Sequence, residues 1–147
     1  MKSALKRYVI TAIAILAATL VIEVSVLITT KATGWNHAEN GRPWAVAAHV
    51  HLLVLGVVWF LTATLLEKNF ELSAVKLAKP AYIVHLCGLG ATVAVILYKG
   101  FAQLTGGSVI RGLVEGGAAI SHIVLFVGLL LWLITVFKAV AVKNKTE

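Results

Sequence analysis

The sequence predicts an all-α integral membrane four-helix bundle, with residues 1–147 in a single domain. Two observations on composition support this: 60% of the 147 residues are hydrophobic, and the mean hydropathy is +0.95. A chain this apolar, with no aspartate, lies outside the range of ordinary soluble domains. Third, the apolar residues form four long runs, each close to the roughly 20 residues that a helix needs to cross the hydrocarbon. We expect helices at about 8–30, 44–66, 80–98 and 117–138.

The first predicted helix, at 8–30, occupies the position of a secretory signal peptide. It is too long for the apolar region of such a signal, it carries Glu23, and no small-residue cleavage site is evident. We therefore expect it to be retained as a membrane helix. The single cysteine, Cys87, lies inside the third predicted helix, so we expect no intrachain disulfide.

Lysine and arginine are distributed unequally between the two ends of the predicted helices. One end carries Lys31, Arg42, Lys99 and Arg111, and the other carries Lys2, Lys6, Arg7, Lys68, Lys76, Lys79, Lys138, Lys143 and Lys145. The positive-inside rule places the richer end, with both termini, in the cytoplasm. This predicts a multi-pass protein of the bacterial cytoplasmic membrane. The topology signal and contact with anionic membrane lipid account for the net charge of +7, so we expect no nucleic-acid partner.

Two histidines, His49 and His51, interrupt the apolar second helix. Polar side chains inside a membrane span usually face a bundle interior, a partner or a cofactor, because hydrocarbon offers no hydrogen bonds. On an α-helix, residues two positions apart point about 200° apart. The two imidazoles therefore face nearly opposite sides of the helix. This spacing predicts two separate groups, one on each side, rather than one small ligand bound by both.

Two further polar residues lie at the same depth as this pair. Glu23, His49, His51 and His122 stand seven to nine residues from the nearest outer charge, which is roughly 10 to 14 Å along a helix. His85 stands fourteen residues from the nearest outer charge and falls outside this layer. We interpret His85 as a residue that hydrogen-bonds across helices. The sequence thus predicts an outer-layer site with three candidate histidine ligands, and with Glu23 in the polar network that supports them.

The residue types in this layer favour heme over a bare metal ion. A metal ion needs several ligands that converge at about 2 Å from one point, and the divergence of His49 and His51 opposes that. Heme b needs one imidazole on each face of a flat ring, apolar walls, and cations for its propionates. The leucine, valine and aromatic residues that follow His51 can form such walls. Arg42 and Arg111, at the outer end, are the candidate propionate partners.

The stretch Ala48-His49-Val50-His51-Leu52-Leu53-Val54-Leu55-Gly56 resembles a helix of the heme-copper oxidase catalytic subunit. In that family a His-x-His pair ligates the high-spin heme with its first histidine and the low-spin heme with its second, near the outer side of the membrane. The resemblance implies these roles for His49 and His51. The twelve helices of that subunit form three groups of four, and this chain resembles one group. It is also similar to a family of small four-helix bacterial membrane proteins of unknown function.

The resemblance does not extend to a copper centre. The chain has no adjacent His-His pair and no His-x-x-x-Tyr pattern, so we expect heme b without copper, and a heme carrier rather than a complete oxidase. We predict a membrane b-type heme protein that transfers electrons, or binds or senses a small gas such as nitric oxide or oxygen. One alternative is a small permease or metal-handling protein with a site made of Glu23, His49 and His122. Another is an accessory subunit whose histidines only pack.

The opposite orientations of His49 and His51 suggest how copies of this chain assemble. We expect a homo-oligomer and an unidentified redox partner. In a trimer, His51 of one subunit and His49 of the next would clamp one heme. In the competing arrangement, His49 or His51 pairs with His122 inside one bundle, and a dimer or a monomer would suffice.

Overall fold

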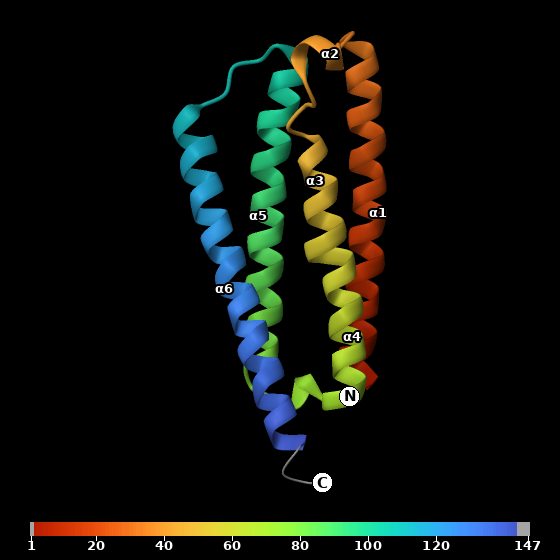
Figure 1. Cartoon of the computed structure of the whole chain (residues 1–147), viewed down its shortest axis with the longest axis vertical. Helices are drawn as coiled ribbons and strands as arrows, with labels where there is room; N and C mark the ends of the chain where they lie inside the picture. Colours follow the sequence, from red (N-terminus) through yellow and green to blue (C-terminus); the bar gives the residue numbers. More distant parts are fainter. Residues whose placement is uncertain (1, 144–147) are drawn as a thin grey trace.

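The computed structural model describes residues 2–143, and these form helices joined by short connections, without a strand (Figure 1). Four helical spans are long and apolar enough to cross a membrane, which confirms the all-α multi-pass architecture. The elements are α1 (Lys2–Ala32), α2 (His37–Asn40), α3 (Val46–His51), the π-helix η1 (Leu52–Val58), α4 (Trp59–Phe70), the 3-10 helix η2 (Leu72–Ala74), α5 (Ala78–Thr105) and α6 (Arg111–Lys143). The second span is the continuous run of α3, η1 and α4.

The helices are longer than the sequence predicted. The third was expected to end at 98 and the fourth to begin at 117, but α5 continues to Thr105 and α6 begins at Arg111. Charged residues had marked the limits of the predicted spans. A helix continues beyond the hydrocarbon into the headgroup layer, where charged side chains are solvated, so charges do not end it. Gly106 ends α5 instead, with a φ of 69° that favours glycine.

The four spans pack as two antiparallel hairpins (Figure 1). In the first, α1 packs along η1 and α4 of the second span, and in the second, α5 packs along α6 over most of its length. The first residues of α1 and the last described residues of α6 lie at the same end of the bundle (Figure 1). We call this the inner end, because it carries the larger number of lysines and arginines, and the opposite end the outer end.

Two glycines bring α5 and α6 into close contact. A Cβ atom added at Gly88 would lie 2.5 Å from backbone atoms of Leu125, and one added at Gly128 would lie 2.6 Å from Cα of His85. Small residues at such points allow membrane helices to approach closely, where van der Waals packing holds them together. The α5–α6 hairpin therefore depends on the absence of side chains at both positions.

The inner half of the bundle is filled by aromatic rings. Tyr8 contacts Phe60, Tyr82 and Trp132, with ring centroids between 5.6 and 6.3 Å apart, and all but Tyr82 of these are fully buried. The outer half is packed by smaller aliphatic side chains such as Leu52 and Leu89. Toward the outer end, α6 diverges from α3 (Figure 1). The predicted histidine layer lies in this outer half.

Candidate functional site: paired histidines within the membrane

The second span changes helix type directly after the two histidines. His49 and His51 lie in α3, and the next seven residues form the π-helix η1. The backbone N–H of Trp59 bonds to the carbonyls of Val54 and Gly56, not to that of Leu55, which would be its α-helical partner. The expected uniform α-helix is therefore interrupted. π-Helical segments are rare and often lie at functional sites.

His51 faces α6, where it meets His122. Their ring centroids lie 6.1 Å apart and their ring planes are at 88°. The Nδ1 atom of His51 lies 2.8 Å from the carbonyl oxygen of Ala47, and that of His122 lies 2.7 Å from the carbonyl oxygen of Ala118. A carbonyl oxygen only accepts hydrogen bonds, so both Nδ1 atoms carry the proton. Each Nε2 is then left with a lone pair, which is the form of histidine that binds a metal ion.

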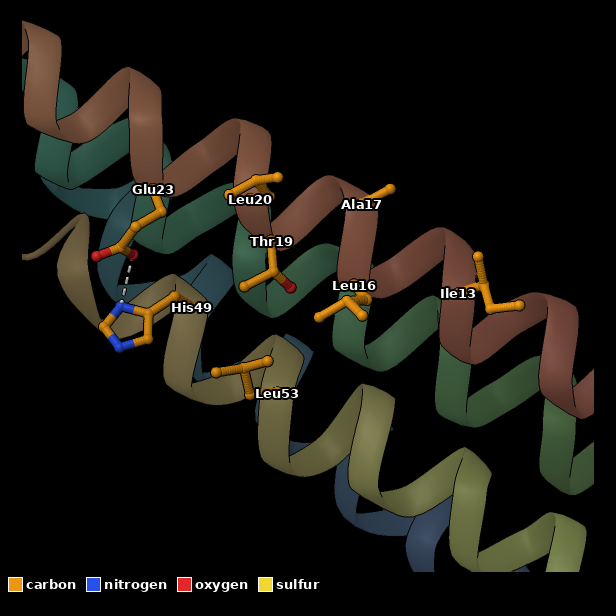
Figure 2. A pocket seen from close by; sticks show the side chains of 8 residues that line it. All are labelled: Ile13, Leu16, Ala17, Thr19, Leu20, Glu23, His49 and Leu53. Carbon is orange, nitrogen blue, oxygen red and sulfur yellow. Dashed lines mark ion pairs between the residues drawn. The ribbon is translucent and has the colours of Figure 1, made fainter.

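His49 faces the other side of the helix, where it meets Glu23 of α1 (Figure 2). Its Nδ1 atom lies 3.0 Å from Oε2 of Glu23, but the ring N–H is not aligned for a hydrogen bond. The two residues are at one end of a cavity of about 700 Å³ between α1 and the second span, otherwise lined mainly by apolar residues such as Ile13, Leu16 and Leu53 (Figure 2). Polar side chains inside a membrane span usually pair with one another, and these two do so.

The predicted layer is thus two pairs on opposite sides of one helix. His51 pairs with His122, and His49 pairs with Glu23. The two imidazoles do face opposite sides of the helix, and the prediction that each serves a separate ligand stays a prediction. In the described part of the chain, no group of three or more His, Cys, Asp or Glu residues is placed to hold a metal ion, and the alternative site made of Glu23, His49 and His122 stays a prediction.

The two arginines predicted as propionate partners lie at the outer end. Arg42 is exposed in the connection before the second span, and Arg111 is the exposed first residue of α6. Arg42 precedes the span that carries His51, and Arg111 begins the helix that carries His122. Their contact with propionates stays a prediction.

His85 forms a hydrogen bond to a backbone carbonyl of the π-helix. Its side chain is fully buried on α5, and its Nε2–H donates to the carbonyl oxygen of Leu55 at 2.7 Å. This is the carbonyl that the N–H of Trp59 leaves unbonded. The His85 ring also stacks on Trp59, with centroids 5.7 Å apart and planes at 14°. The interpretation of His85 as a hydrogen-bonding residue outside the outer layer is confirmed. Its link to a π-helix was not predicted, because the sequence of the second span carries no pattern that indicates one.

The change His85→Phe tests this role. Phenylalanine keeps a flat ring but removes the donor, so the Leu55 carbonyl would lie in the bundle without its side-chain partner. We expect the free energy of unfolding in detergent to fall by about 1 to 2 kcal/mol. The matched control is His37→Phe, at an exposed position of α2, which should be nearly neutral. Equal stability of the two variants would exclude a structural role for the bond.

Taken together, the fold and these side chains define a multi-pass membrane protein with paired imidazoles in the outer half of its helices. The chain belongs to the family described as "Protein of unknown function (DUF2871)", whose model matches residues 5–139. The match includes nearly all of the four spans, and it confirms the similarity to a small membrane family of unknown function. Comparison with curated proteins and with solved structures gave no match.

Proposed function

We propose that this protein is a membrane b-type cytochrome in which His51 and His122 are the two axial ligands of one heme per chain. One observation carries the proposal: these imidazoles come from different hairpins, face each other with centroids 6.1 Å apart, and have both Nδ1 atoms held by backbone carbonyls. Hydrogen bonds of this kind fix the tautomer and the ring orientation that an axial histidine needs.

The separation of the rings fits a shared metal. Two imidazoles that each place a nitrogen about 2 Å from one metal ion have ring centres roughly 6 Å apart. His122 is exposed and His51 is half-buried, so one flank of the pair is open toward the lipid, where a flat ring can enter. Arg42 and Arg111 would receive propionates directed toward the outer end. Heme bound here would supply a one-electron carrier.

Two protein ligands favour electron transfer over gas binding. When both axial positions are taken by histidine, none remains open for oxygen or nitric oxide. The resemblance to heme-copper oxidases supports the same assignment, since the second histidine of their His-x-His pair is the low-spin ligand and His51 matches it. His49 would match the high-spin ligand, but in this chain it stands beside Glu23. The internal His51–His122 pair favours the arrangement within one bundle, and the oligomer stays a separate proposal.

Spectroscopy of the purified protein tests this function. Expressed with an adequate heme supply, it should carry one heme per chain, with a low-spin ferric spectrum typical of two imidazole ligands. Carbon monoxide should leave the ferrous spectrum nearly unchanged, because no axial position is open. A high-spin heme that binds carbon monoxide would contradict the ligand pair. A colourless protein that retains zinc or copper would contradict the cytochrome and favour the metal-handling alternative.

A further inference from the structure

A second cavity lies at the inner end of the bundle, far along the helices from the histidine pairs. Its volume is about 460 Å³, and it is bounded by the start of α1, by η2 and by the start of α5. Three cationic side chains line it: Arg7 from α1, Lys76 from the connection before α5, and Lys79 from the first turn of α5. The hydroxyl-bearing residues Ser3 and Ser73 also line it. The cavity is thus polar where the Glu23–His49 cavity is mainly apolar.

The three cations have no carboxylate partner. Within residues 2–143, none of Arg7, Lys76 and Lys79 forms an ion pair with an acidic residue. Glu67, a fully buried carboxylate at this end, is engaged by Ser73: Oε2 accepts from the backbone N–H at 2.8 Å and Oε1 accepts from the hydroxyl at 2.5 Å. The cavity therefore gathers three cations, and Glu67, whose carboxylate is held by the cavity residue Ser73, forms no ion pair with any of them.

Arg7 is held in place by aromatic rings. Its guanidinium carbon lies 4.8 Å from the ring centroid of Tyr82 and 5.4 Å from that of Tyr8. The hydroxyl of Tyr82 is in turn 2.7 Å from that of Thr11. The Nε atom of Arg7 is buried and has no hydrogen-bond partner. A buried guanidinium N–H without an acceptor is costly, and an acceptor from outside the chain would remove that cost.

We propose that this cavity binds a phosphate group, with Arg7 as the planar donor and Lys76 and Lys79 as flanking charges. The guanidinium fork matches phosphate oxygens, and lysine contributes a point charge. The cavity lies at the inner end of the spans, and basic pockets between helices at the cytoplasmic side of a membrane bind anionic lipids. An anionic phospholipid or a soluble phosphate would present the same group.

A charge-matched comparison of two triple variants tests the site. In the first, Arg7, Lys76 and Lys79 are each changed to Gln. In the second, Lys6, Lys68 and Lys138 are changed to Gln, which removes the same formal charge from the same end but leaves the cavity intact. Short-chain phosphatidylglycerol is titrated into the detergent-solubilised full chain, with phosphatidylcholine as the zwitterionic reference. We expect the first variant to bind phosphatidylglycerol about 10- to 100-fold more weakly, and the second to lose about threefold or less.

A titration with inorganic phosphate separates the two sources. If inorganic phosphate binds the original protein and not the first triple variant (the cavity variant), the ligand is a soluble phosphate. If phosphatidylglycerol binds and inorganic phosphate does not, the ligand is a lipid. Equal losses in the two triple variants, or no preference for phosphatidylglycerol over phosphatidylcholine together with no phosphate binding, would overturn the proposal. Circular dichroism verifies that both variants fold. If the cavity variant does not, the single change Arg7→Lys keeps the charge but removes the fork, and it should weaken binding by about tenfold; unchanged binding in that variant would overturn the role of Arg7. None of these readouts depends on heme.

Discussion

Replacing His51 or His122 with alanine should remove nearly all heme from the purified protein, lowering the heme-to-protein ratio by about tenfold or more. Each imidazole supplies one of the two axial bonds in the proposed arrangement, and its loss also frees the partner ring, whose centroid lies 6.1 Å away. The backbone should be little affected, because both Nδ1 atoms bond within their own helices. Heme content by pyridine hemochrome and helix content by circular dichroism measure the two effects.

The matched control is His49→Ala, two residues away on the same short helix. His49 faces Glu23 on the other side, so this variant should keep its heme and its low-spin spectrum. Loss of heme from the His49 and His51 variants, with full retention in the His122 variant, would instead support the clamp between neighbouring subunits. Full heme content in a His49/His51 double variant would remove the basis of the cytochrome proposal.

Gly88→Ala and Gly128→Ala should each destabilise the protein by about 2 to 3 kcal/mol, because the added methyl group would meet backbone atoms of the facing helix. The distances of 2.5 Å and 2.6 Å leave no space that a flexible side chain could vacate. Separation of α5 from α6 would also displace His122, so heme content should fall with stability. Unfolding by denaturant in mild detergent gives the difference in free energy.

Gly90→Ala is the control for both glycine variants. Gly90 lies on α5 two residues after Gly88, and an added Cβ would meet nothing within 4 Å. Alanine is a better helix former than glycine by about 1 kcal/mol, so this variant should be as stable as the original or slightly more stable. Equal destabilisation at all three positions would show that helix flexibility, and not the close contact, explains the effect.

The spans and the opposed histidines could be predicted because both depend on local properties. Hydropathy locates a membrane helix, and helical geometry alone sends His49 and His51 to opposite sides. Which residue each one meets could not be predicted from spacing. That depends on how the hairpins are rotated and how closely they approach, which glycines such as Gly128 determine through contacts remote in sequence. The π-helix could not be predicted either. Its Leu55 carbonyl is bonded by the side chain of His85, which comes from another helix and is remote in sequence.

The two-hairpin architecture bears on how the protein is assembled in the cell. Each hairpin has its own internal contacts, so each can form soon after insertion, and docking of the hairpins then completes the bundle. His51 and His122 belong to different hairpins. A ligand bound by both would link the two hairpins at the outer end, where α6 diverges from α3. A ligand that binds only the docked form stabilises that form by mass action. Heme supply during synthesis would then govern how much of the newly made chain reaches its mature form and escapes degradation.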